Sequence, residues 1–328
     1  MQSTRRILLA GVLAAALGAP ALSAQAADWP SQKPISYVVP FTVGGSTDVV
    51  GRVIAQKLGE RLHQNVVVEN KPGAAGGIGA AYVAKATPDG YTLFGGTIST
   101  HAINASLYKS LKYDPVKDFE PVSLVATLPN VLLVDPNLGV NSVADLIALL
   151  KRDPAKRTFA SSGAGTSTHL TGELFAGMIG VPLTHVPYKG TPPAMVDVSS
   201  GAVTFMFDQM TAALPLLQTG KLKLLAVTTK NRIKLSPETP TMAQAGVPGF
   251  DVASWQAVYA PKGTPKPIVD RLSREIAAIL KEPDVQEKLG KTMGMELVGS
   301  TPEQLRDLMA TEIPRWADVV KQSGASVD

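Results

Sequence analysis

Two loops rich in glycine and hydroxyl residues contain the side chains best suited to binding chemistry. The first loop spans residues 40–48, between a predicted strand and a predicted helix. Its candidate ligand-binding residues are Phe41, Gly44, Gly45, Ser46, Thr47 and Asp48. Glycines let the backbone approach a ligand closely, and a helix N-terminus presents N–H groups to an anion. The pattern favours an anion-binding loop and an ordinary capped turn equally. Asp48 is negatively charged, so we expect it to cap the loop or to hold a water molecule and not to contact an anion directly.

A second loop of the same kind spans residues 161–169 and leads into a predicted helix. It contains five hydroxyl residues and two glycines. Its candidate ligand-binding residues are Ala164, Gly165, Thr166, Ser167 and His169. Backbone amides and hydroxyls at a helix N-terminus form a neutral receptor for an oxyanion, whereas the alternative is a simple capping turn. A serine nucleophile is not favoured here, because the Gly-x-Ser-x-Gly pattern is absent.

The remaining motifs predict neither a cofactor nor a metal ion. The glycine-rich stretch 71–79 lacks the G-x-G-x-x-G spacing of a dinucleotide-binding loop, and no Walker lysine follows it. The four histidines, His63, His101, His169 and His185, lack the spacing of metal ligands. Lysines and arginines do not cluster among aromatic residues, so nucleic acid is not an expected partner. We expect the stretch 71–79 to be a packing loop.

Residues 1–26 predict a signal peptide. Two arginines precede an apolar run over residues 7–19, and an Ala-x-Ala pattern follows at Ala24 and Ala26. We therefore expect cleavage near Ala26 and export to the periplasm, by either the general secretory or the twin-arginine route. The sequence contains no cysteine, so its stability must come from buried apolar area. Without the signal peptide, the chain has 29 lysines and arginines and 27 acidic residues, which gives a net charge near +2.

Short β-branched runs alternate with amphipathic stretches along the rest of the chain. This alternation is typical of α/β proteins in which helices cover parallel sheets. The predicted strands are residues 35–40, 65–69, 92–95, 131–134, 157–160, 183–186, 203–207, 222–227 and 252–260. The clearest helix has an apolar residue at every fourth position from 268 to 280. The patterns that start at Ser142 and Thr301 predict capping boxes, and a mature chain of about 300 residues suits two lobes of roughly 150 each.

A series of ordered motifs runs from about residue 29 to the C-terminus. They are P-F at 40–41, G-G-S-T-D at 44–48, V-E-N-K-P-G at 68–73, P-D-G-Y-T-L at 88–93, Y-D-P at 113–115, D-F at 118–119, G-T-S-T-H-L at 165–170, H-V-P-Y-K-G at 185–190, F-D at 207–208 and G-V-P-G-F at 246–250. Together they resemble the periplasmic substrate-binding proteins of tripartite tricarboxylate transporters, also called Bug receptors. One departure is the pair Thr42 and Val43, where many members carry proline or small residues.

The resemblance implies a two-lobed type II periplasmic-binding-protein fold. Each lobe is then a mostly parallel sheet flanked by helices, with the ligand cleft between the lobes. We expect residues 27–125 and 251–328 in the first lobe and residues 126–250 in the second. The resemblance also implies that one loop of each lobe, 41–48 and 164–169, holds a ligand carboxylate. The further residues expected in the cleft wall are Tyr188, Lys189, Gly190 and Asp208.

The function implied is that of a non-catalytic, monomeric receptor. It would capture a small organic carboxylate and deliver it to the membrane components of a tripartite tricarboxylate transporter. One alternative is an exported hydrolase that uses Ser162 or Ser167 with His169 or His185, although the sequence shows no oriented triad. Another is a ligand-reporting partner of a sensor kinase. Dicarboxylates, citrate-like acids, amino acids and aromatic carboxylates all stay open as ligands.

Overall fold

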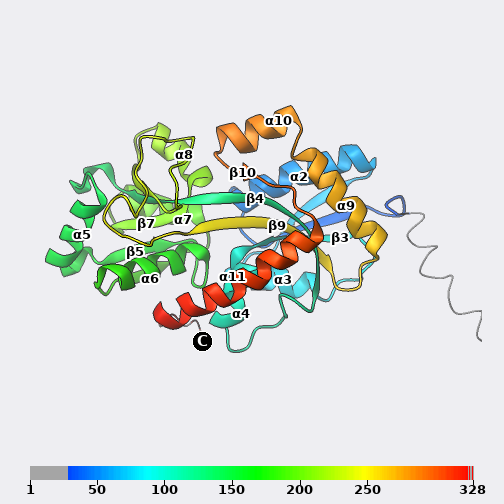
Figure 1. Cartoon of the computed structure of the whole chain (residues 1–328), viewed down its shortest axis with the longest axis horizontal. Helices are drawn as coiled ribbons and strands as arrows, with labels where there is room; N and C mark the ends of the chain where they lie inside the picture. Colours follow the sequence, from blue (N-terminus) through cyan, green and yellow to red (C-terminus); the bar gives the residue numbers. More distant parts are fainter. Residues whose placement is uncertain (1–28, 324, 326, 328) are drawn as a thin grey trace, which may run out of the picture.

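The computed structural model describes residues 29–323, 325 and 327. The predicted signal peptide, residues 1–26, lies outside the described residues. Figure 1 shows an elongated molecule with two α/β halves, the blue and orange segments at one end and the green segments at the other. Two long strands, β4 (Phe119–Val134) and β9 (Ala253–Pro261), run along the middle. The α/β fold class predicted from the sequence is therefore confirmed.

The first half is built on β1 (Ile35–Val39), which pairs in parallel with β2 (Val66–Asn70) and β3 (Thr92–Thr97). Helices α2 (Ser46–Leu62) and α9 (Lys266–Ile279) pack against one another on this half. The apolar stripe predicted for residues 268–280 is buried there, as expected from its helical spacing. The other elements of this half are η1 (Ala74–Gly76), α3 (Gly77–Val83), η2 (Ser99–Ile103), α4 (Asn104–Leu107), α10 (Pro283–Val285), η5 (Gln286–Thr292) and β10 (Glu296–Leu297).

The second half repeats the parallel arrangement around β5 (Thr158–Ser161). This strand pairs with β6 (Thr184–Pro187) and β7 (Phe205–Gln209). The remaining elements of this half are η3 (Pro136–Leu138), α5 (Val143–Arg152), η4 (Pro154–Lys156), α6 (Ser167–Ile179), α7 (Thr191–Ser199), α8 (Met210–Gln218) and β8 (Lys223–Val227). The capping box predicted at the start of α5 is present, because Asp145 N–H donates to Ser142 Oγ over 3.1 Å.

The centre of the sheet is antiparallel, which the sequence pattern did not predict. Strand β4 pairs with β9 as far as Pro129 and then, from Asn130, with β7 and β8. The prediction of a strand at 131–134 alone was wrong in length, because β4 begins at Phe119 and runs through two prolines. Register shifts near Pro121 and between Leu124 and Ala126 accommodate this irregular strand. The sheet is therefore mixed, with parallel strands outside and antiparallel strands at the junction.

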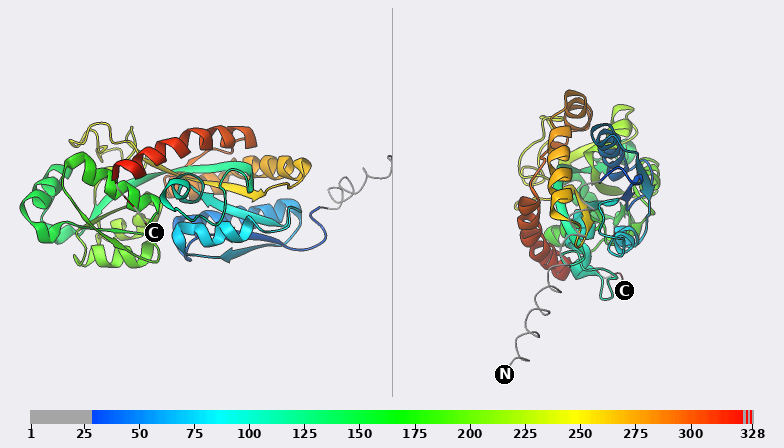
Figure 2. Two further views of the ribbon diagram at one scale, coloured as in Figure 1. Left: turned by 90° about the horizontal axis from the view of Figure 1, so that it is seen from below. Right: turned by 90° about the vertical axis from the view of Figure 1, so that its right-hand side faces the viewer.

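The last helix, α11 (Pro302–Ser323), lies across both halves (Figure 2). It contacts β4, η2 and α4 of the first half and α6 of the second. Its buried Glu312 accepts hydrogen bonds from the indole N–H groups of Trp255, over 3.2 Å, and Trp316, over 3.1 Å. The capping box predicted at Thr301 starts this helix, since Thr301 N–H donates to Gln304 Oε1 over 2.9 Å. Helix α11 thus adds a connection between the halves besides β4 and β9.

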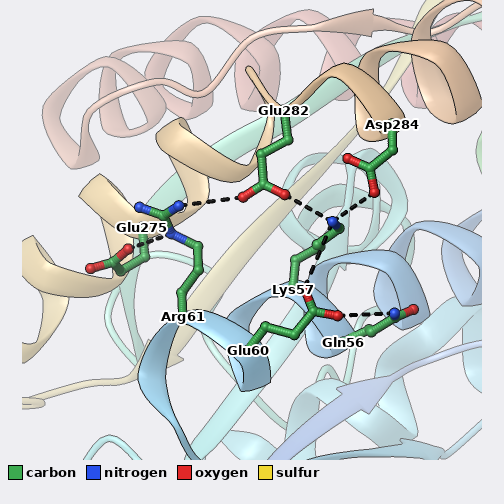
Figure 3. A network of polar contacts seen from close by, with 7 residues as sticks. All are labelled: Gln56, Lys57, Glu60, Arg61, Glu275, Glu282 and Asp284. Atoms are coloured by element: carbon green, nitrogen blue, oxygen red, sulfur yellow. Dashed lines mark hydrogen bonds and ion pairs between the residues drawn. The ribbon is translucent and has the colours of Figure 1, made fainter.

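A charged network holds the C-terminal end of α2 against α9 and α10 (Figure 3). Lys57 Nζ lies 2.9 Å from Glu282 and 2.6 Å from Asp284, and Arg61 Nε lies 2.6 Å from Glu275. These ion pairs fix one end of the helix whose other end faces the second half. They lie at the surface, so each contributes little stability alone and is sensitive to salt.

Candidate functional site

A polar cavity lies where the first and second halves meet. It contains about 450 Å³ of empty space, its open mouth included. Both predicted loops contribute to its wall, together with residues from β3, β7 and β9. The residues that line it are Phe41, Thr42, Gly45, Ser46, Thr47, Thr97, Ser99, Ser162, Thr166, Ser167, Gly190, Thr191, Asp208, Gln209 and Ser254. Apart from Asp208, all of these side chains are uncharged.

The N-terminus of α2 presents open backbone amides to this cavity. Its N-cap, Gly45, provides no side-chain cap, and the helix begins at Ser46. The N–H groups of Ser46 and Thr47 therefore have no carbonyl acceptor within the helix. Both residues line the cavity and are themselves buried. These amides and the helix dipole form a site suited to an anion.

Asp48 is turned toward its own loop. Its carboxylate accepts hydrogen bonds from Gly44 N–H over 3.0 Å and from Asn70 Nδ2 over 2.9 Å, and it forms a two-point ion pair with Arg52. Burial opposes ionisation of Asp48, but the hydrogen bonds from Arg52, Gly44 and Asn70 outweigh it and lower the pKa of this carboxyl. The charge of Asp48 is thereby compensated beside the cavity, which leaves the amides of α2 free to attract an anion.

The N-terminus of α6 is arranged differently. Thr166 is its N-cap, and Thr166 Oγ1 accepts a hydrogen bond from His169 N–H. The N–H of Ser167 donates across the interface to Ser99 Oγ over 3.1 Å. Much of the hydrogen-bonding capacity of this helix terminus is thus used inside the protein. The side chains of Thr166 and Ser167 still line the cavity.

The two halves touch directly around the cavity. Ser46 Oγ contacts Gln209 Oε1, and Gln209 Nε2 donates to Ser254 Oγ over 3.2 Å. Two glycines of the second half allow close approach: a Cβ at Gly190 would lie 2.3 Å from Thr42 Oγ1, and a Cβ at Gly165 would lie 2.6 Å from Leu107. Both glycines also have positive φ angles, 122° and 82°, so other residues would be strained there.

Asp208 is the charged group in the cavity wall. Its side chain is 1% exposed, and it accepts hydrogen bonds from Thr191 Oγ1 over 2.8 Å and from Gln209 N–H over 2.7 Å. Burial is the dominant influence and raises the pKa of Asp208 to about 6, although these two hydrogen bonds favour the ionised form. Asp208 can therefore change charge under mildly acidic conditions.

Seven of the residues predicted for the site do not line the cavity. They are Gly44, Asp48, Ala164, Gly165, His169, Tyr188 and Lys189. The Tyr188 hydroxyl donates a hydrogen bond to Asp197, and Lys189 is exposed. The other eight predicted residues come together in the wall: six come from the two loops, one is Gly190 at the start of α7, and one is Asp208 in β7.

The serines and histidines are not arranged for nucleophilic catalysis. Ser162 Oγ contacts Thr168 Oγ1 over 3.0 Å, and His169 Nδ1 accepts from Gly165 N–H over 3.1 Å. The closest serine–histidine pair in the described chain is Ser161 Oγ with His185 Nε2, at 2.6 Å. Ser161 is fully buried and does not line the cavity, so its hydroxyl has no path to a substrate.

The described residues contain neither a cluster of metal ligands nor a helix that could span a membrane. No group of three or more histidine, cysteine, aspartate or glutamate side chains is placed to hold a metal ion among residues 29–323, 325 and 327. In the same part of the chain, every helix is too short or too polar to cross a membrane.

Comparison with known proteins identifies the family. Residues 50–325 match the protein-family model described as the tripartite tricarboxylate transporter family receptor. The chain belongs to this family. The resemblance seen in the sequence motifs is therefore confirmed. The protein BugT of Bordetella pertussis is 40% identical over 328 residues, and the alignment covers all of both chains.

Solved structures of relatives share the fold of this receptor. An R. palustris protein determined with adipate is 42% identical, covers 91% of this chain and 99% of its own, and superposes with a TM-score of 0.88. The periplasmic binding protein BugD is 38% identical, with 90% and 99% coverage and a TM-score of 0.85. MatC from Rhodopseudomonas palustris, determined with malate, is 34% identical, with 88% and 99% coverage and a TM-score of 0.84.

Seven residues of the cavity wall were not among the individually named ligand-binding candidates. They are Thr42, Thr97, Ser99, Ser162, Thr191, Gln209 and Ser254. Several of them stand at or just beyond strand ends, such as Thr97 at the end of β3 and Gln209 at the end of β7. A polar residue that closes an apolar strand is therefore a signal for this site, because ligands of α/β sheets gather at strand ends.

Proposed function

We propose that this receptor captures a small organic carboxylate between its two halves and delivers it to the membrane components of a tripartite tricarboxylate transporter. The observation that carries the proposal is the open N-terminus of α2, whose Ser46 and Thr47 amides face a cavity without a cationic side chain. Such amides and hydroxyls bind anions, and the carboxylate is one of the common anionic groups of metabolites. The adipate and malate in two solved relatives support this ligand class.

In this proposal the ligand carboxylate lies against both loops. The N–H groups of Ser46 and Thr47 donate from the first half, the hydroxyl of Ser167 donates from the second, and the other predicted wall residues, Thr166 among them, shape the space. The protein acts as a binding module and carries out no reaction. Among the described residues that line the cavity there is no histidine, and the contacting pair of Ser161 and His185 lies outside the wall, which supports a role without catalysis.

The division into lobes 27–125 with 251–328, and 126–250, is also part of the proposal. The exchange of β9 for β7 and β8 as partners of β4 near Asn130 supports a junction in this region. Ligand then favours a closed arrangement, because it contacts both lobes only when they approach. Small-angle scattering with and without ligand should show a smaller radius of gyration in the complex and a monomeric mass. A profile unchanged by ligand that matches an open shape would contradict the clamp.

The proposed location is the periplasm, after cleavage near Ala26. The periplasmic relative BugD and the predicted signal peptide support it. Intact-mass measurement of the protein recovered from the periplasm tests the cleavage position directly. A mass that retains residues 1–26 would contradict cleavage.

The central experiment is native mass spectrometry of the purified receptor, followed by incubation with any compound that it carries. We expect a carboxylate that is released unchanged on denaturation. Turnover of the carried compound would overturn the binding role and favour an exported hydrolase. A carried compound without a carboxylate would overturn the proposed ligand class but not the binding role.

A further inference from the structure

Thr97 and Gln256 form an unsatisfied polar pair beneath the cavity. They are direct partners across the antiparallel pairing of β3 and β9, so their side chains lie on the same face of the sheet. Thr97 is 4% exposed and Gln256 is 3% exposed. Among the described residues, Thr97 Oγ1 and both Gln256 side-chain atoms, Nε2 and Oε1, have no hydrogen-bond partner.

This pair adjoins the proposed anion site. Thr97 lines the cavity, and so does Ser254, which precedes Gln256 by two residues on β9 and shares its face of the strand. Helix α2 covers the same face, because Cβ atoms at Gly51 of α2 and Gly95 of β3 would lie 3.1 Å and 3.0 Å from the Tyr37 ring. The open amides at the start of α2 and the polar pair therefore belong to one side of the sheet.

Buried polar groups in native proteins almost always have partners, because burial without a hydrogen bond costs free energy. A carboxamide next to a hydroxyl offers both donors and acceptors. The group that satisfies them best is therefore one that donates and accepts at a single atom. A hydroxyl does so, whereas an ammonium group only donates and a second carboxylate only accepts.

We propose that Thr97 and Gln256 form a deep subsite for the hydroxyl group of a hydroxy-substituted carboxylate. The ligand hydroxyl donates to Gln256 Oε1 and accepts from Gln256 Nε2 or Thr97 Oγ1, while the carboxylate lies at the amides of α2. The inference rests on the proposed function and narrows the substrate class of the same site. Because the subsite has a fixed position relative to the carboxylate site, it selects one enantiomer.

The test compares acids that differ by one hydroxyl: succinate with malate, glutarate with 2-hydroxyglutarate, and adipate with 2-hydroxyadipate, each hydroxy acid as separate enantiomers. Calorimetric titration of the wild-type receptor should show at least one pair in which one enantiomer binds about tenfold tighter than its parent acid. In Gln256→Met, which keeps the length of the side chain, this preference should vanish while the parent acid keeps its affinity within about twofold.

Thr97→Val, which keeps the shape of the side chain, is the second variant and should reduce the same preference. Melting temperatures of ligand-free proteins show whether each variant is folded. Equal binding of parent and hydroxy acids to the wild type would overturn the subsite and leave the proposed function intact. If Gln256→Met weakened the binding of the parent acid and of the hydroxy acid equally, the hydroxyl subsite would be overturned, and a bound water molecule would be the partner of Gln256. Failure of every acid to bind would overturn the subsite for these acids, whereas the proposed function is tested separately by the compound that the receptor carries through purification.

Discussion

The two helix N-termini that meet at the cavity differ in how they use their amides. At α2 the cap is Gly45, which has no side chain, so the amides of Ser46 and Thr47 stay open. At α6 the cap is Thr166, and the first amide, that of Ser167, donates a hydrogen bond to Ser99 of the other half. The loops look alike in sequence, since both combine glycine, serine and threonine before a helix.

This difference assigns the two termini different parts in the proposed mechanism. The open terminus of α2 supplies oriented dipoles for the carboxylate, and the charged network at its far end fixes the helix. The self-capped terminus of α6 supplies the hydroxyl of Ser167 and a contact that connects the halves. Substitutions at equivalent positions of the two helices can therefore separate binding from closure.

The largest effect is expected from Ser46→Pro. Proline at the first position of a helix is tolerated, and Gly45, with φ −75° and ψ 166°, already has the conformation required before proline. The change removes an open N–H at the cavity and the hydroxyl that contacts Gln209 Oε1 of the other half. We expect a loss of affinity of about a hundredfold, from one hydrogen bond to a charged group and from the lost contact between the halves. Calorimetric titration with the carried carboxylate measures it.

Ser167→Pro is the matched variant, because Ser167 has the same position in α6 and Thr166 has a similar backbone conformation, φ −75° and ψ 163°. It removes an amide that already has an acceptor, so its effect should be smaller and should accompany weaker closure in scattering. Ser46→Ala isolates the loss of the hydroxyl. If Ser167→Pro weakened binding more than Ser46→Pro, the assignment of roles to the two helices would be reversed.

A second, smaller effect is expected from Ser167→Ala. Its hydroxyl lines the cavity but is not the helix cap, since Thr166 Oγ1 accepts from His169 N–H. We expect affinity to fall about tenfold to a hundredfold, as for one hydrogen bond to a charged group, with an unaltered melting temperature. Thr166→Ala should instead destabilise the ligand-free protein by about 1 kcal/mol. If Ser167→Ala bound the ligand with normal affinity, the Ser167 hydroxyl would not be one of the groups that contact the carboxylate.

The sequence was sufficient to predict the two loops but not the difference between them. It could not show that Ser99 lies within 3.1 Å of the Ser167 amide, because 68 residues separate them along the chain. The alternation of strands and helices predicted the α/β class, whereas the antiparallel junction of β4 and β9 depends on pairing between distant segments. Gln209, Ser254 and Gln256 were missed for the same reason, because only the pairing of β4 with β7 and of β9 with β3 and β4 brings these strand residues to the cavity or next to it.

A third prediction concerns Asp208, the charged side chain between the two termini. Burial raises its pKa to about 6, so it is ionised above that pH and opposes a bound anion. Affinity should rise about threefold to tenfold as the pH falls from 8 to 5.5, while the ligand stays ionised. Asp208→Asn should bind more tightly at pH 8 and lose this dependence. A wild-type affinity that fell on acidification would place Asp208 away from the ligand charge.

The smallest effect is expected from salt, and it contrasts the cavity with the far end of α2. The cavity wall contains no lysine or arginine, so anion binding depends on oriented amides close to the ligand, which mobile ions screen weakly. The network around Lys57 and Arg61 consists of surface ion pairs and is screened readily. Raising the salt concentration from 0.02 M to 0.5 M should weaken ligand binding less than about threefold. Lys57→Met should lower the melting temperature at low salt, and this difference should shrink at high salt. If high salt instead reduced affinity by several factors of ten, a cationic side chain would have to reach the ligand in the complex, and the receptor would not bind its anion by dipoles alone.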